Sequence, residues 1–183
     1  QPVLSAGDVT DIINNRTESN VTRVVLKQTT DLEKDPANEN YNNGVRSLNI
    51  GDCEHAVSYF EQALTQNLTM IKKTDALLYL YRNEAYCLIE LKRYGDAVAT
   101  ADKGLLSYPR DPILWNNKGY AFYLLGRNDD ALKAYTAAVS YDGNYTNAYI
   151  NQGNVLHDMG RYRDAITAYT RANETAPFNI AAA

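Results

Sequence analysis

Residues 112–145 and residues 146–179 are two copies of one pattern, and they align with each other without a gap. At six aligned positions an aromatic residue matches an aromatic residue, glycine matches glycine, or alanine matches alanine. The aligned pairs are Trp115 and Tyr149, Gly119 and Gly153, Gly126 and Gly160, Ala131 and Ala165, Tyr135 and Tyr169, and Ala138 and Ala172. A repeat of about 34 residues indicates helix–turn–helix units, which bury their apolar stripes by stacking on one another. We therefore expect an all-α chain built from successive helix pairs.

The residue types at the aligned positions indicate the kind of repeat. Aromatic residues occupy positions 4 and 24, small residues occupy positions 8, 20 and 27, and proline follows at position 32 as Pro109 and Pro177. This pattern resembles the tetratricopeptide repeat (TPR) family. The resemblance implies a right-handed α-solenoid of about four TPR helix–turn–helix repeats with an N-terminal extension. The expected TPR array, residues 37–179, consists of repeats 37–70, 78–111, 112–145 and 146–179.

The first two copies depart from the family pattern. Repeat one has Asn40 and Asn43 where the family prefers an aromatic residue and leucine. Repeat two has Ala101 and Gly104 at positions 24 and 27, both smaller than expected, and residues 71–77 are inserted before it. Terminal copies are often atypical, so we interpret repeat one as a degenerate repeat.

Two helix starts are signalled by aspartate followed by proline, at Asp35-Pro36 and Asp111-Pro112. The aspartate side chain can accept a hydrogen bond at the N-cap, and proline fits the first helical position because its missing N–H would be unpaired there. We expect the first helices of repeats one and three to begin at these pairs.

Residues 1–36 form an N-terminal extension or arm of different composition. All fifteen tyrosines lie beyond it, and its apolar residues gather in two clusters, residues 9–13 and 21–26. Two alternatives stay open: a leader helix that packs on the first repeat, and an arm that docks onto a neighbouring subunit.

The end of the sequence predicts an assembly face. Residues 180–183 open a fifth repeat, truncated or completed by another molecule, and no polar capping helix follows in the given sequence. The residues expected on the uncovered face are Tyr149, Leu156, Ile166, Tyr169, Phe178 and Ile180. Head-to-tail contact through such a face builds open filaments unless it closes on itself. The alternative is that the sequence is part of a longer protein.

Several features predict an exported protein. The sequence begins with Gln1, as expected of a mature chain whose signal peptide has been removed. The five Asn-x-Thr sequons are predicted N-glycosylation sites: Asn15, Asn20, Asn67, Asn144 and Asn173. The last three fall at positions 31, 33 and 28 of their repeats, so we expect them along one edge of the stacked repeats.

The two cysteines, Cys53 and Cys87, occupy position 17 of repeat one and position 10 of repeat two. Both positions are near the turn end of adjacent antiparallel helices. A disulfide between them would suit an oxidising compartment, and a pair of buried thiols is the alternative.

The composition excludes several function classes. A net charge of −4 argues against a nucleic-acid-binding protein, and no apolar run is long enough for a membrane span. The only histidines, His55 and His157, lie far apart, and no metal-ligand cluster, catalytic triad or phosphate-binding loop is visible. We expect neither enzymatic activity nor a cofactor.

The TPR resemblance also implies a concave groove, lined by positions 2, 5, 9 and 12 of each first helix. The residues this assigns to the groove are Arg82, Tyr86, Asn116, Tyr120, Tyr123, Ile150, Asn154 and His157. Their aromatic rings and amides could stack on and hydrogen-bond to a peptide or a glycan. The carboxylate clamp of chaperone-binding TPR proteins is not matched, because Tyr86, Asn147 and Asn151 stand at three of its positions.

These features predict a non-catalytic, exported TPR protein of a microbial surface, N-glycosylated and able to self-assemble head to tail as a surface or filament subunit. Its partner would then be another copy of itself. The alternative is a monomeric extracellular adaptor that binds a peptide or partner protein in its concave groove. A third possibility is a fragment of a larger enzyme or sensor.

Overall fold

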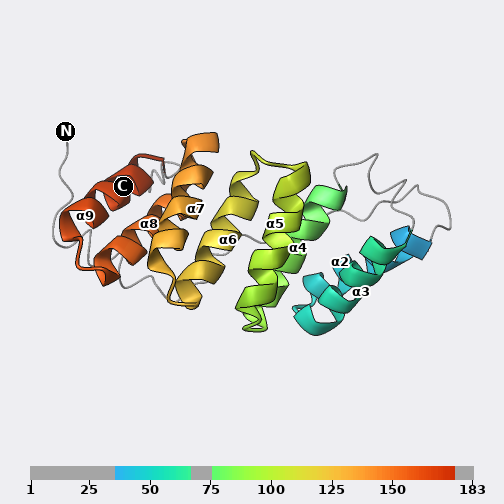
Figure 1. Cartoon of the computed structure of the whole chain (residues 1–183). Coiled ribbons are helices and arrows are strands. Elements are labelled where there is room, and N and C mark those ends of the chain that lie inside the picture. Colours follow the sequence, from blue (N-terminus) through green and yellow to red (C-terminus); the bar gives the residue numbers. More distant parts are fainter. Residues whose placement is uncertain (1–35, 67–75, 176–183) are drawn as a thin grey trace, which may run out of the picture. The chain divides into compact units, whose positions relative to one another are not determined.

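The computed structural model describes residues 36–66 and 76–175, and in these ranges the chain is helical with no strand (Figure 1). The helices form four helix–turn–helix pairs. Their bounds are α2 Pro36–Asn49 and α3 Cys53–Thr65, α4 Ala76–Glu90 and α5 Tyr94–Ser107, α6 Pro112–Leu124 and α7 Asn128–Tyr141, and α8 Thr146–Asp158 and α9 Tyr162–Thr175. The predicted all-α class, an array of TPR-like helix pairs, is confirmed.

The helix pairs belong to two compact parts, one containing α2–α5 and the other α6–α9. Within the first part, α3 packs on α4; within the second, α7 packs on α8. Each part therefore has its own core made from two helix pairs. No helix in the described ranges is long and apolar enough to cross a membrane.

The helix starts follow from local chemistry. Asp111 caps α6 by accepting a hydrogen bond from the backbone N–H of Leu114 at 2.8 Å, and Pro112 follows at the first helical position. The turns that close α6–α7 and α8–α9 contain Gly126 and Gly160 with φ of +73° and +74°. Residues other than glycine rarely adopt this left-handed conformation, which explains why both repeats have glycine at this equivalent position.

The two helices of a pair interlock through a glycine and an aromatic ring. Gly153 in α8 lies against Tyr169 in α9 so closely that an added Cβ would be 2.5 Å from the ring. Gly119 has the same relation to Tyr135, at 2.7 Å. Gly44 faces the Phe60 ring in the α2–α3 pair, again at 2.5 Å. The small residue at position 8 is thus required by the large one at position 24.

The α4–α5 pair lacks this interlock. Position 8 is Ala85 and position 24 is Ala101, and both are fully buried. Near them α4 buries the carboxyl group of Glu84, which is 4% exposed. This second pair is therefore packed by small side chains around an acidic group.

Candidate protein-binding surfaces

Aromatic side chains from α6, α8 and α9 gather with an aspartate on one surface of the second compact part. The Tyr120 and Tyr123 rings are 6.3 Å apart, and the Tyr123 hydroxyl donates a hydrogen bond to Asp158 Oδ2. His157 lies next to this carboxylate, with Nδ1 3.3 Å from Oδ1, and its ring meets Tyr162 edge to face at 5.4 Å. All five side chains are at least partly exposed. We name these five residues the aromatic cluster.

The aromatic cluster unites three of the residues assigned to the groove, Tyr120, Tyr123 and His157. Sequence reasoning missed Asp158 and Tyr162, which complete it. The link between Tyr123 and Asp158 spans 35 residues, one more than the repeat period. That near-match to the period is the only signal in the sequence that could have indicated the contact.

The structure corrects the groove assignment of two asparagines. Asn116 is fully buried, and its Oδ1 accepts a hydrogen bond from Asn151 Nδ2 at 2.9 Å, which ties α6 to α8. Asn154 is also buried, and its Oδ1 accepts from the Tyr169 hydroxyl at 2.8 Å. These amides satisfy polar groups inside the helix packing and are not an open binding surface.

The other groove candidates are partly buried surface residues. Ile150 is on α8. Arg82 and Tyr86 are on α4, in the first compact part. The Arg82 guanidinium lies 5.4 Å from the centre of the Tyr79 ring. Tyr86 lines a cavity of about 500 Å³ together with Asp52 and other residues of α2, α3 and α4.

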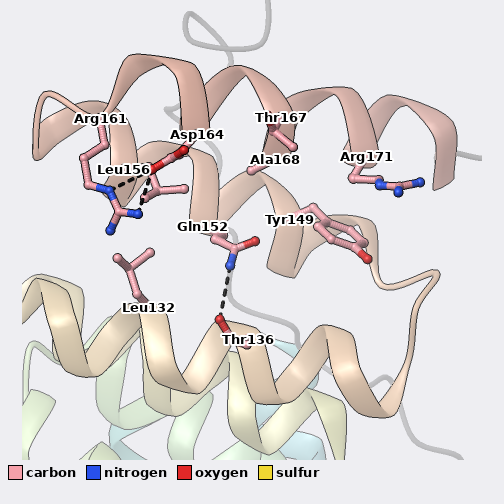
Figure 2. A pocket seen from close by; sticks show the side chains of 10 residues that line it. All are labelled: Leu132, Thr136, Tyr149, Gln152, Leu156, Arg161, Asp164, Thr167, Ala168 and Arg171. Carbon is pink, nitrogen blue, oxygen red and sulfur yellow. Dashed lines mark hydrogen bonds and ion pairs between the residues drawn. The ribbon is translucent and has the colours of Figure 1, made fainter. Parts of the chain in front are cut away.

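A cleft of about 420 Å³ runs between α7 and α9, with α8 beneath it (Figure 2). The Arg161–Asp164 ion pair, at 2.7 Å, is at one end. Gln152 Nε2 donates to Thr136 Oγ1 at 3.2 Å across the middle, and Tyr149 lines the cleft near the other end. The mixed lining offers an aromatic ring, apolar carbon and hydrogen-bonding groups within one compact part.

The outer face of α9 exposes two large side chains. Ile166 is 42% exposed and Tyr162 is 60% exposed. The structure corrects the predicted assembly face at Leu156 and Tyr169, which are buried in the α8–α9 core with Ala165 and Ala168. Both face the partner helix of their own pair. Of the other predicted face residues, Tyr149 lines the cleft, and Phe178 and Ile180 lie outside the described residues.

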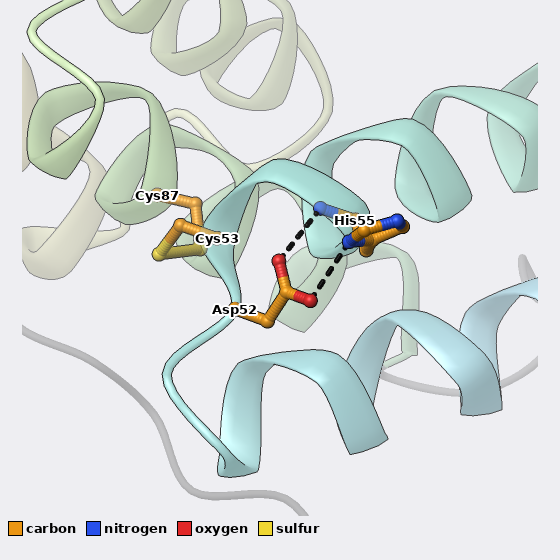
Figure 3. The surroundings of a disulfide bond; sticks show 4 residues. All are labelled: Asp52, Cys53, His55 and Cys87. Carbon is orange, nitrogen blue, oxygen red and sulfur yellow. Dashed lines mark hydrogen bonds and ion pairs between the residues drawn. A yellow bond between two sulfur atoms is a disulfide. The ribbon is translucent and has the colours of Figure 1, made fainter.

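Cys53 and Cys87 form a disulfide that joins α3 to α4, with Cα atoms 4.9 Å apart (Figure 3). Next to it, Asp52 caps α3 by accepting from the backbone N–H of His55 at 3.1 Å, and its second oxygen lies 2.7 Å from His55 Nδ1. The backbone hydrogen bond from His55 lowers the pKa of Asp52. The disulfide therefore connects the atypical first helix pair to the second.

Glu84 is a buried acid with few partners. Its Oε1 accepts a hydrogen bond from Thr100 at 3.4 Å, whereas Oε2 has no partner in the described structure. Burial raises the pKa of Glu84 to about 7, the nearby Glu61 adds to the rise, and Lys103 opposes it. The side chain is therefore largely neutral at mildly acidic pH.

Two predicted glycosylation sites lie at one end of the α8–α9 pair. Asn144 is exposed in the turn before α8, and Asn173 is exposed in the last turn of α9. Their sequon threonines, Thr146 and Thr175, are in contact, with hydroxyl oxygens 3.0 Å apart. The other three sites, Asn15, Asn20 and Asn67, lie outside the described residues.

Candidate metal ligands do not cluster in the part of the chain that the structure describes. No group of three or more histidine, cysteine, aspartate or glutamate side chains there is placed to hold a metal ion. His55 interacts with Asp52 and His157 with Asp158, at distant places in the sequence. The surfaces described above are suited to binding.

Comparisons with known proteins agree with this architecture. Tetratricopeptide repeat models match residues 82–149 and 146–179, which together make up more than half of the chain. MamA from Desulfovibrio magneticus RS-1 is similar in structure, with a TM-score of 0.68 and 19% identity over 78% of this chain and 76% of that one. A second MamA structure, MSR-1 C2, gives a TM-score of 0.62 and 16% identity over 92% of each chain.

The first TPR of Spaghetti (RPAP3), bound to the HSP90 peptide SRMEEVD, has a TM-score of 0.53 and 23% identity over 56% of this chain and 84% of that one. At these identities the structural neighbours show the fold alone. Comparison with curated protein sequences gives no match. The repeat period, the glycine–aromatic interlocks and the two family matches agree, and the chain belongs to the tetratricopeptide repeat family.

Proposed function

We propose that this chain is an exported, non-catalytic scaffold that self-associates head to tail through the outer face of α9. The TPR fold is a scaffold for protein–protein interaction. One similar structure contains a bound peptide, as its name states.

The observation that carries the proposal is the repeat register of α7 and α9. Leu132 on α7 packs against the buried cluster of the next helix pair, and Thr136 accepts a hydrogen bond from Gln152 on α8. The equivalent positions on α9, one repeat later, are Ile166 and Thr170. Ile166 is 42% exposed, whereas the equivalent Leu132 is covered in part by α8. A helix or strand from another molecule would bury this isoleucine as α8 buries the leucine.

The partner we propose is the N-terminal extension of a second copy. The edge of α2 that corresponds to the contact face of α8 is polar, with Asn40 donating to Gln66 and Asn43 accepting from Arg46. A polar edge is poorly suited to covering Ile166. The extension supplies apolar residues instead, in the cluster Val21, Val24, Val25 and Leu26. Because donor and acceptor surfaces differ, the contact is heterologous and can continue from copy to copy.

Two features support an exported location. A disulfide that joins two helix pairs persists in oxidising compartments and is rare in reducing ones. The two described sequons present exposed asparagines, as a glycosylated surface requires. Both features fit a protein that works outside the cytosol.

Sedimentation velocity over a range of concentrations tests the self-association. The full chain should associate, and Ile166→Asp should lower the association constant at least tenfold, because the apolar contact is lost and a charge is introduced. Val24→Asp, in the donor segment, should have a similar effect. Leu106→Asp is the matched control, because Leu106 on α5 is 87% exposed and has no role in the proposed contact.

Association that is unchanged in Ile166→Asp would remove α9 as the contact surface. A wild-type chain that stays monomeric at high concentration would remove self-association itself. If Ile166→Asp dissociates the assembly and Val24→Asp does not, the surface is right and the donor segment is wrong.

The aromatic cluster favours a second function, the binding of a peptide from another protein. Its partly exposed rings and the Asp158 carboxylate can contact both apolar and hydrogen-bonding groups. A Tyr120→Ala and Tyr123→Ala double variant separates the two functions, since it should leave self-association intact. Loss of association in this variant would place the subunit contact at the aromatic cluster.

A further inference from the structure

We propose that the sequons of Asn144 and Asn173 form one coupled modification site, in which Asn144 is the oligosaccharide acceptor of the folded chain and Thr175 restrains it. This inference rests on the proposed export, because it specifies how the exported chain is modified. It is carried by the secondary structure at the two asparagines and by the contact between their threonines.

Asn144 is in a position that a modifying enzyme can reach. It lies in the turn between Tyr141, the last residue of α7, and Thr146, the first residue of α8, and its side chain is exposed. The turn is held by local hydrogen bonds: the backbone N–H of Asn144 donates to Asp142 Oδ1 at 3.0 Å, and the backbone N–H groups of Tyr145 and Thr146 donate to the carbonyls of Asp142 and Asn144. Surface turns are the usual setting of modified sequons.

Asn173 is exposed but helical, in the last turn of α9. An enzyme that reads Asn-x-Thr must engage the asparagine and the threonine together. Residues two apart on a helix point in different directions, so Asn173 and Thr175 are not presented to one site. Modification at Asn173 therefore requires the end of α9 to unwind.

The two sequons are connected through their hydroxyl groups. Thr175 Oγ1 donates to the Ala172 carbonyl at 3.1 Å and lies 3.0 Å from Thr146 Oγ1. The Thr146 hydroxyl, which belongs to the Asn144 sequon, thus has a partner on α9 in addition to the Asn144 carbonyl oxygen, which lies 3.5 Å away. To present this hydroxyl to an enzyme, the chain must first break its contact with Thr175.

The reaction is a glycosyl transfer from a lipid diphosphate-linked oligosaccharide. A bond forms between the Asn144 amide nitrogen and the anomeric carbon of the sugar. The anomeric C–O bond breaks, the lipid diphosphate leaves with the bonding electrons, and the amide nitrogen loses a proton. Nothing is oxidised or reduced in this step.

The test is glycosylation of the purified, folded full chain by an oligosaccharyltransferase with a lipid-linked donor. Initial rates at each asparagine are measured by peptide mass spectrometry. Short synthetic peptides that contain either sequon serve as unstructured references. We expect the folded chain to be modified at Asn144 and not at Asn173, while both peptides are modified.

Two variants that both destroy the Asn173 sequon test the coupling. Thr175→Val removes the hydroxyl that holds Thr146, so the rate at Asn144 should rise about two- to fivefold, the factor that corresponds to one side-chain hydrogen bond. Asn173→Gln keeps Thr175, so the rate at Asn144 should stay at the wild-type value. Circular dichroism of both variants verifies that the helices are retained.

Equal rates at Asn144 and Asn173 in the folded chain would overturn the proposal. So would a folded chain that is modified at neither site while the peptides are modified. Equal effects of Thr175→Val and Asn173→Gln would remove the coupling. Because this assay measures modification alone, its outcome is independent of the sedimentation test of self-association.

Discussion

The second and fourth helix pairs build the same fold from different side chains. In α8–α9 a glycine, Gly153, accepts the ring of Tyr169 against its backbone. In α4–α5 the same two positions are Ala85 and Ala101, and both side chains are fully buried. The residues at positions 8 and 24 pack against each other, so their sizes must be complementary. A glycine with an aromatic ring and a pair of alanines are both complementary in size.

The difference has consequences for polar groups. The interlocked α8–α9 pair satisfies its buried tyrosine, since the Tyr169 hydroxyl donates to Asn154. The α4–α5 pair instead buries Glu84 with one oxygen that has no partner among the described residues. A disulfide from Cys53 on α3 holds α4 at Cys87. We infer that the less interlocked pair depends on this covalent link for stability.

The largest effect is expected from removing the disulfide. The Cys53→Ser and Cys87→Ser double variant should lose about 3–4 kcal/mol of unfolding free energy, because the bridge closes a long loop, with a sequence separation of 34, and restricts the unfolded chain. Urea denaturation followed by circular dichroism measures the loss. No change in the urea midpoint would show that α4–α5 is stable without the link.

The next largest effect comes from the pH dependence at Glu84. The unfolded carboxyl ionises near pH 4.5, whereas the folded one has a pKa of about 7. The folded state therefore holds the proton more tightly, and stability falls as the pH rises from 4.5 to 7, by roughly 3 kcal/mol in all. In Glu84→Gln this loss should disappear. Urea denaturation of the wild type and of Glu84→Gln at pH 5 and pH 8 measures this pH dependence. The same loss of unfolding free energy in both proteins would contradict the role of Glu84.

A smaller effect is expected from adding a methyl group to the interlock. Gly153→Ala places a Cβ about 2.5 Å from the Tyr169 ring, so either the ring or the α8 backbone must move. We expect the unfolding free energy to fall by about 2–3 kcal/mol. Gly95→Ala in α5 is the control, because nothing lies within 4 Å of its added Cβ. That change should stabilise the chain by about 0.5–1 kcal/mol through helix propensity. Thermal denaturation of the two variants should show opposite shifts.

The smallest effect is expected from removing the hydroxyl group of one of two equivalent tyrosines. Tyr169→Phe removes the hydrogen bond to Asn154 and should lower the unfolding free energy by about 1–2 kcal/mol. Tyr135, its counterpart in α6–α7, has a hydroxyl without a partner in the described structure, and burial raises its pKa well above the usual range. Tyr135→Phe should therefore be neutral or slightly stabilising. Equal losses in the two variants would indicate a partner for the Tyr135 hydroxyl.

Tyr135 and Tyr169 occupy equivalent positions, but only the Tyr169 hydroxyl has a hydrogen-bond partner in the described structure. This difference shows what the 34-residue repeat could predict and what it could not. Like-for-like matches at positions 8, 20, 24 and 27 predicted the helix pairs, and the close approach of glycine and ring explains the residue types at positions 8 and 24. Position 9 is not restricted in this way: it is Tyr120 in one pair and Asn154 in the next. Asn154 accepts a hydrogen bond from the Tyr169 hydroxyl, whereas Tyr120 accepts none from the Tyr135 hydroxyl. This difference depends on side-chain direction, which the spacing of residues does not encode.

The candidate surfaces were predictable only in part for the same reason. Family positions assigned Asn116 and Asn154 to an open groove, but both amides are buried, where they accept hydrogen bonds from Asn151 and Tyr169. The predicted assembly face placed Tyr169 and Ile166 on one surface, yet Tyr169 turned inward and Ile166 outward. Glu84 could have been noticed, since an acidic residue stands there at position 7, where the family prefers leucine. Its burial follows from the packing of α4.

The most direct test of the proposed self-association is negative-stain electron microscopy of the untagged full chain beside its Ile166→Asp variant. Head-to-tail contact through α9 predicts elongated or ring-shaped assemblies of repeating subunits for the wild type, and dispersed particles of one size for the variant. Dispersed single particles in both samples would contradict the account and leave the aromatic cluster as the binding surface of a monomeric scaffold.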